Sequence, residues 1–298
     1  MTTSQYAEPP PRASLGRRLS TFFHRHPRVS LAVLLALPIG WLAIGYLGSL
    51  FVLLLSAFWD TNPFTSEVVH NYTLDNFKRL WEQDVYREVA WRTIRMAALV
   101  TIADAVLAFP IAYYMARVAK PRVRNLLVVA VVMPLWASYL VKAYAWRTML
   151  SGAGVINWAL DPLGITFDGY SEVGLWLVFT YLWLPFMILP VYAGLERIPQ
   201  SLLDASADLG GRSLRTFYRV ILPIAFPAVV AGSIFTFSLT LGDYIAPDLI
   251  TSEQFIGTVI YDQRGTNLPV AAAFTLVPIT VMIIYLTVAR KLKAFEAL

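Results

Sequence analysis

Six long apolar segments dominate this sequence and constrain its fold more than any other feature. Each consists mostly of Leu, Val, Ile, Ala and Phe, and each reaches the length of about 20 residues that a helix needs to cross a bilayer core. The connections between them are too short for a soluble domain of ordinary size. The segments predict an all-α membrane protein with six transmembrane helices. They lie at 31–58, 89–116, 126–149, 173–195, 221–242 and 269–290.

The composition agrees with a membrane class. The chain is 57% hydrophobic and 14% charged, which is too apolar for an ordinary soluble surface. The first apolar segment runs to Trp59 and is much longer than the core of a secretion signal, which has about 7–15 apolar residues. We therefore expect an uncleaved spanning helix there.

The distribution of basic residues predicts the orientation. If the N-terminus, the 117–125 link, the 196–220 link and the C-terminus share one side, that side carries 16 of the 24 Lys and Arg residues. The other side carries eight basic and 13 acidic residues. The positive-inside rule then places both termini in the cytoplasm. We expect a cytoplasmic N-terminal tail at 1–29, a transmembrane domain at 30–292 and a cytoplasmic C-terminal end at 293–298.

The inventory of reactive side chains argues against several kinds of site. With no cysteine and three histidines, the chain is not expected to form a disulfide or a thiolate or histidine-cluster metal site. None of its five lysines follows a glycine, so it cannot build a Walker phosphate loop, and G-x-S-x-G and H-E-x-x-H motifs are absent. We therefore predict no catalytic residue, no metal and no cofactor bound by this chain. Because the basic residues follow the membrane topology, nucleic acid is not predicted as a partner, whereas membrane lipid is.

The connection from Glu196 to Pro223 is the most informative part of the sequence. Pro199 suits the first turn of a helix and Gly210 suits the residue after its end, so these positions predict a helix over Gln200–Leu209. A second helix is expected to begin near Ser213 and to lead into the fifth crossing.

The first of these two helices has an acidic and an apolar surface. Asp204 and Asp208 are spaced i, i+4 and share a face, where they would repel each other. This arrangement favours a partner surface with basic groups, and the alternative is a solvated loop with ordinary caps. The apolar surface is formed by Leu202, Leu203, Ala205 and Leu209.

A few ionisable and aromatic residues lie within or at the ends of the crossings. Asp104 falls in the middle of the second crossing, and Asp243 and Tyr244 fall at the outer end of the fifth. A carboxylate beside an aromatic ring suits an amine cation, through charge pairing and cation–π attraction. The alternatives are a structural pair or hydrogen bond for Asp104 and helix capping for Asp243. An aromatic belt is the alternative to a path role for Trp136, Tyr139, Tyr144 and Trp146.

One pattern resembles a known family. Permeases of binding-protein-dependent ABC importers carry a cytoplasmic signature of E-A-A, three residues, Gly, nine residues, Ile, one residue and Leu-Pro. This sequence has Asp for Glu, Ser for the second Ala and Val for Ile at those spacings. The matching residues are Asp204-Ala205-Ser206, Gly210, Val220, Leu222 and Pro223.

The resemblance implies a type I ABC importer permease fold, in which the helix carrying the signature is a coupling helix seated in a groove of the ATPase. Asp204 would then meet a basic residue of the ATPase, Ala205 would permit close approach, and Gly210 would allow the sharp turn. The residues implied in ATPase coupling are Asp204, Ala205, Ser206, Asp208, Leu209, Gly210 and Pro223.

Further stretches resemble the spermidine/putrescine branch of these permeases, and the resemblance covers about residues 70–290. It implies a bacterial cytoplasmic membrane location and import of a small organic solute such as a polyamine. It also implies an ABC ATPase dimer that binds ATP and magnesium, a second related permease and an extracytoplasmic solute-binding protein. The stretches are Met133–Trp136, Ser138–Trp146, Gly154–Asn157 and Leu241–Pro247.

Two other classes of function are weighed against this interpretation. A secondary transporter driven by an ion gradient would use Asp104 with Arg92 or Arg95 as its relay and would need no structured 196–223 connection. An intramembrane enzyme would need Asp104 and Asp243 to converge, and their different depths disfavour it.

Overall fold

A computed structural model describes residues 24, 26–62, 65 and 67–291 of the chain. The chain divides into two compact parts, Met1–Leu55 and Ser56–Leu298. Most of the predicted N-terminal tail and all of the predicted C-terminal end at 293–298 lie outside the described residues.

In the first part, the described residues from Pro27 onward form one long helix. It is formed by α2 (Pro27–Trp41), the π-helical segment η1 (Leu42–Leu47) and α3 (Gly48–Ser56), which run on without a break for 30 residues. At about 1.5 Å per residue the helix is about 45 Å long, enough to cross a bilayer with some tilt. This confirms a spanning helix at the first predicted segment and moves its start from 31 to 27.

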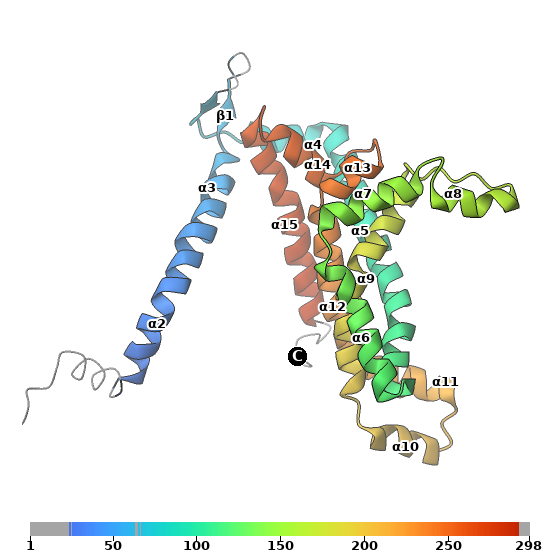
Figure 1. The fold of residues 1–298 in the computed structure, drawn as a ribbon. Helices are drawn as coiled ribbons and strands as arrows, with labels where there is room; N and C mark the ends of the chain where they lie inside the picture. Colours follow the sequence, from blue (N-terminus) through green and yellow to red (C-terminus); the bar gives the residue numbers. More distant parts are fainter. Residues whose placement is uncertain (1–23, 25, 63–64, 66, 292–298) are drawn as a thin grey trace, which may run out of the picture. The chain divides into compact units, whose positions relative to one another are not determined.

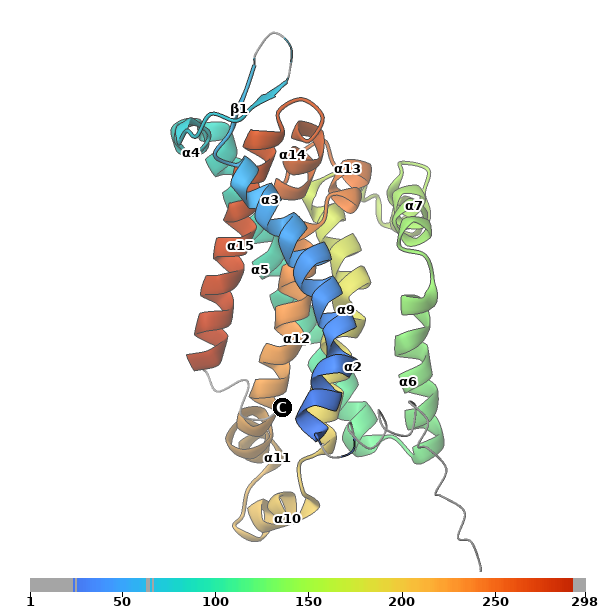
Figure 2. The ribbon, with the colours of Figure 1, turned by 90° about the vertical axis from the view of Figure 1, so that its left-hand side faces the viewer.

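The second part is a bundle of long helices that run side by side (Figures 1 and 2). Helices α5, α9 and α12 pack against one another, and α15 packs against α12. Pro223 and Pro227 lie inside the apolar run that makes up the fifth crossing. The bundle helices are α5 (Asp84–Tyr113) with its π-helical end η2 (Tyr114–Val118), α6 (Pro121–Trp136), α9 (Glu172–Glu196), α11 (Ser213–Thr216) with η4 (Phe217–Ile221) and α12 (Leu222–Gly242), and α15 (Leu268–Lys291).

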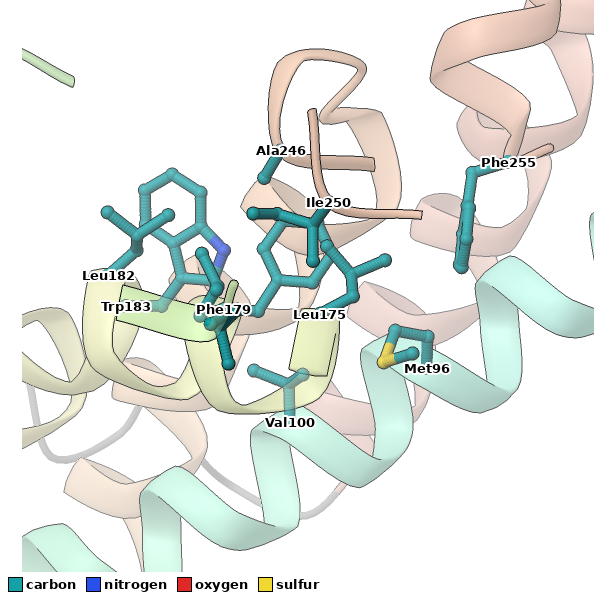
Figure 3. Packing of buried hydrophobic residues seen from close by; sticks show 11 residues of the cluster. Met96, Val100, Leu175, Phe179, Leu182, Trp183, Ala246, Ile250 and Phe255 are labelled. Carbon is teal, nitrogen blue, oxygen red and sulfur yellow. The ribbon is translucent and has the colours of Figure 1, made fainter. Parts of the chain in front are cut away.

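Two buried clusters hold α5 and α9 together. The cluster nearer the outer end joins Met96 and Val100 of α5 to α9 and to the short helix α13 (Ile245–Ile250) (Figure 3). The second joins Ala108 and Ala112 of α5 to the other half of α9. Along the whole of α5, the buried positions repeat at helical spacing and form one continuous stripe.

The third crossing differs from the single helix predicted at 126–149. Helix α6 ends at Trp136, Ala137 and Ser138 are extended, and α7 (Tyr139–Leu150) departs at 94°. With 16 residues, α6 alone is about 24 Å long, which is short for a hydrocarbon core of about 30 Å. Hydropathy detects the apolar run but not the break, because the direction of α7 is set by a contact far away in sequence: the Tyr139 hydroxyl donates to the Asp243 carboxylate.

Short elements cover the end of the bundle that lies away from α10 (Gln200–Asp208) (Figure 1). The predicted interfacial helix near Leu74–Glu82 is present as α4, and buried Asn76 fixes it by donating to the carbonyls of Ala57 and Trp59. The elements at this end are β1 (Asp60–Thr61) paired antiparallel with β2 (Val68–Val69), α4 (Asp75–Glu82), α8 (Val155–Leu160), η3 (Asp161–Leu163), α13 and α14 (Ile256–Gln263).

Counted by length and composition over the described residues, five helices can cross a membrane, and the bent α6–α7 pair is the sixth if it counts as one span. The links at 117–125 and 196–220 lie at one end of the bundle and α4, α13 and α14 at the other (Figures 1 and 2). The predicted six-span organisation is therefore confirmed, and the two basic links share a side as expected.

We predict that Gly194→Ala destabilises the bundle, because a Cβ at this position would lie 2.4 Å from the Cβ of Ala228 on α12. Separating α9 from α12 should cost about 1–3 kcal/mol. Thermal unfolding of the detergent-solubilised protein measures the effect. Gly152→Ala is the control, since nothing lies within 4 Å of its Cβ, and equal midpoints for the two variants would contradict the close approach of α9 and α12.

Candidate coupling segment and solute path

The predicted coupling signature folds into a helical hairpin at one end of the bundle. Pro199 is extended and precedes α10, which ends at Asp208 with Leu209 as its cap residue. Gly210 has a φ of 76°, in the left-handed region that glycine adopts without strain. The amide of Gly211 donates to the Ser206 carbonyl at 2.8 Å, which closes the helix end. The predicted helix and the predicted turn at Gly210 are both confirmed.

A side-chain contact closes the hairpin. The hydroxyls of Ser206 on α10 and Thr216 on α11 lie 2.8 Å apart and are hydrogen-bonded. Gly211 fits between them, because a Cβ there would lie 2.6 Å from both the carbonyl and the hydroxyl oxygen of Ser206. The hairpin is therefore a defined structure and not a solvated loop.

The hairpin presents an uncovered apolar and acidic surface. Leu209 is 88% exposed and Leu214 is 72% exposed. Asp204 and Asp208 are exposed on the same helix, and Gln200 donates to Asp204 at 3.1 Å. Leu203 instead packs toward the core beside Phe217. Large exposed apolar side chains beside paired carboxylates are typical of a protein–protein contact surface.

At the opposite end, Asp243 joins three elements. Its Oδ1 accepts from the amides of Ile245 at 2.8 Å and Ala246 at 3.1 Å, so it caps the start of α13. Its Oδ2 accepts from the Tyr139 hydroxyl at the start of α7. The capping alternative for Asp243 is thus realised, and Asp243 also fixes α7 to the end of α12.

Asp243 also borders an open hollow of about 390 Å³ between α7, α9 and α12. Tyr139 stacks on Trp183 at a ring separation of 6.0 Å, and the Trp183 Nε1 is buried without a hydrogen-bond partner among the described residues. Sequence patterns missed Trp183 and Ser238, because only the fold brings α9 and α12 to this point. The lining residues are Tyr139, Trp183, Ser238, Leu239, Gly242, Asp243, Tyr244 and Ile245.

Tyr244 extends the aromatic lining away from the hollow. Its ring stacks on Tyr261 of α14 at 4.4 Å, and the guanidinium of Arg264 lies 3.5 Å from the centre of the Tyr261 ring. A cation–π contact is therefore already present at the outer edge of this aromatic pair.

The other aromatic residues predicted for a path lie elsewhere. Trp136 is 87% exposed and Tyr144 is exposed, and neither lines the hollow. Trp146 packs against Tyr181 at a ring separation of 5.3 Å. Of the four, the structure brings only Tyr139 together with Asp243 and Tyr244.

Asp104 lies inside the bundle and not at the hollow. It is fully buried on the α5 stripe between Val100 and Ala108, and neither carboxylate oxygen has a hydrogen-bond partner in the described part of the chain. The arginines considered for a relay are engaged elsewhere. Arg92 pairs with Glu88, Glu172 and Glu253 at 2.8–3.1 Å, and Arg95 pairs with Glu172.

The fold and the hairpin define a class: a multi-pass membrane protein with a structured contact surface at one end. The described residues contain no group of three or more His, Cys, Asp or Glu side chains placed to hold a metal ion. Residues 108–294 match the family described as binding-protein-dependent transport system inner membrane component. The chain belongs to this family and is an inner-membrane permease subunit of an ABC importer.

Relatives agree with this membership. The inner membrane ABC transporter permease protein YdcU of Escherichia coli is 47% identical over 97% of both chains. The spermidine/putrescine transport system permease protein PotB of the same organism is 33% identical over 74% of this chain and 82% of its own. A chain of a bacterial alginate ABC transporter, solved in complex with an alginate-bound periplasmic protein, is 17% identical, with a TM-score of 0.72 over 94% of this chain and 98% of that one. This structural likeness confirms the type I permease fold.

We predict that Gly210→Val opens the hairpin, since a β-branched residue at a φ of 76° is strained by about 1–2 kcal/mol or more. Limited trypsin digestion of the solubilised protein should cut faster at Arg212 and Arg215, beside the turn. Gly210→Asn is the matched control, because asparagine tolerates this conformation and should keep the wild-type cleavage rate. Unchanged cleavage in the valine variant would show that the turn does not need glycine.

Proposed function

We propose that this permease forms half of the pathway of an ATP-driven importer for a small cationic organic solute, such as spermidine or putrescine. A second, related permease supplies the other half, and an extracytoplasmic binding protein delivers the solute. ATP and magnesium are bound by a separate ATPase dimer, on which α10 docks. Both termini lie in the cytoplasm, on the side of the hairpin.

The observation that carries the coupling role is the hairpin itself. Its turn is fixed by Gly210, its two helices are joined by Ser206 and Thr216, and Leu209 is left uncovered at its tip. A rigid, protruding apolar surface with two carboxylates, Asp204 and Asp208, fits a groove with basic groups. In this proposal Ala205 allows close approach to the groove wall, and Pro223 begins the span that the hairpin moves.

The solute class is supported by chemistry at the other end. The hollow combines the Asp243 carboxylate with the rings of Tyr139, Trp183 and Tyr244, a combination that attracts ammonium groups. PotB, a spermidine/putrescine permease by name, is a relative. Asp104 has no place in this path, since it is buried away from the hollow.

A secondary transporter is the competing class. It would use Asp104 with Arg92 or Arg95, but both arginines are engaged with acidic residues from other elements at the outer end of α5. Uptake by the chain alone in proteoliposomes, driven by a proton or sodium gradient without ATP, would overturn the importer proposal.

We predict that Asp204→Lys lowers uptake at least tenfold and weakens co-elution of the ATPase. The lysine would be repelled by the basic groups expected in the ATPase groove. Membrane insertion should be unchanged. The test is ATP-dependent uptake of radiolabelled spermidine and putrescine in proteoliposomes that hold the full complex. The control is Asp161→Lys in η3, which reverses the charge of an exposed residue at the other end of the bundle. Normal uptake with Asp204→Lys would contradict the docking role of α10.

We predict that Asp243→Asn lowers spermidine uptake about tenfold or more, the loss expected when about 1.4 kcal/mol of attraction to an ammonium group is removed. The asparagine oxygen still accepts from the amides of Ile245 and Ala246, and its NH2 group can donate to the Tyr139 hydroxyl oxygen, so folding should be retained. Asp243→Ala, which also loses the cap, should lower the thermal midpoint as well. If the asparagine variant transports at the wild-type rate, Asp243 acts only as a cap and the amine-binding role is wrong.

A further inference from the structure

The joint between α9 and α10, residues 195–199, is hydrogen-bonded by a side chain from a different helix. Arg117, in η2 at the end of α5, donates through one Nη2 to the carbonyls of Leu195 at 2.5 Å and Ile198 at 2.6 Å. The first of these residues is in the last turn of α9, and the second lies beyond its end, before Pro199. The guanidinium therefore bonds to the end of α9 and to the linker that leads into α10.

Electrostatics favour a cation at this position. The last carbonyls of a helix carry partial negative charge and lack partners within the helix. The last turn of α9 contains no basic residue of its own. The cap residue Arg197 follows directly, and Arg117 adds a second cation from η2. Arg117 is half-buried, so its hydrogen bonds are partly shielded from water.

Apolar packing surrounds this contact. The side chains of Leu195 and Ile198 are buried, and they share a cluster with Met115 and Ala116 of η2 and with Ile221 of η4. The linker between α9 and α10 is thus packed between η2, at the end of α5, and η4, which follows the hairpin.

A second bond holds the same helix end from α6. Arg124, in the first turn of α6, pairs with Glu196 at 3.3 Å, and the Tyr192 hydroxyl donates to the same carboxylate oxygen at 3.1 Å. This pair is more exposed than the Arg117 contact and should contribute less. Both bonds connect the 117–125 link to the start of the coupling segment.

We propose that Arg117 is a positioning residue that makes the α9–α10 joint rigid relative to α5, so that a displacement of α10 is passed to α5 and α9 together. The inference rests on the proposed docking of α10 on an ATPase. Arg117 touches neither solute nor nucleotide in this role. Without it, the ATPase still assembles and hydrolyses ATP, but α10 moves without carrying the bundle.

The first test compares Arg117→Ala with Arg122→Ala in the full complex with its binding protein. Arg122 lies in the same link and is exposed. Its replacement removes one positive charge but leaves the Arg117 hydrogen bonds to Leu195 and Ile198 in place. We expect Arg117→Ala to lower solute uptake per ATP hydrolysed at least about fivefold, at the lower end of typical coupling energies. ATPase co-elution should be unchanged, and Arg117→Lys, which keeps a donor cation, should restore part of the coupling. Equal ratios of uptake to hydrolysis in Arg117→Ala and wild type would overturn the inference.

The second test reads the joint directly and does not depend on transport. Because the chain has no cysteine, spin labels can be placed by Val118→Cys and Ser201→Cys, both at exposed positions on η2 and α10. In the purified chain the label distance should be narrowly distributed, and Arg117→Ala should broaden it while Arg122→Ala should not. Equal widths of the label-distance distribution in the wild type and both alanine variants would overturn the positioning role of Arg117. A narrow distribution that only Arg117→Ala broadens, in a chain that recruits no ATPase, would instead overturn the proposed function.

Discussion

The hydrocarbon core requires every backbone amide and carbonyl within it to be satisfied by the protein itself, and the rest of the structure follows from this requirement. It makes each apolar segment a helix and concentrates irregular backbone at the bundle ends. Where α12 stops, the Asp243 carboxylate accepts the free amides of Ile245 and Ala246, and a tyrosine from α7 completes its shell. A single side chain thereby bonds to the start of α7 and to the start of α13.

Features with local causes could be predicted from the sequence. The long helices follow from apolar runs, and α10 follows from Pro199 and Gly210, whose backbone preferences act on their immediate neighbours. The bend at Ala137 and Ser138 could not be predicted, because its cause is the contact of Tyr139 with a residue 104 positions away. The start of the first helix, Pro27, lies four residues before the first apolar segment, because polar residues can begin a helix whose apolar run comes later.

The two candidate sites differ in the same way. The coupling hairpin is encoded by consecutive residues, so motif spacing located it. The hollow is assembled from α7, α9 and α12, and aromatic content alone does not distinguish a ring that lines it from one that faces lipid. Tyr139 and Trp136 are three residues apart, yet one contacts Asp243 and the other is almost fully exposed. No sequence pattern includes Trp183, which stacks on Tyr139 from another helix.

Helix α9 is attached to α5 and its extension η2 at both of its ends. At its N-terminal end, Glu172 in the first turn pairs with Arg92 and Arg95 of α5. At the other end, Arg117 of η2 binds the carbonyls at its last turn. Between these points, two clusters of buried side chains join α5 to α9. Two helices fastened at both ends and packed along their length resist sliding past each other. The 25 residues of α9, about 37 Å of helix, therefore connect the hairpin to the α13 side of the bundle.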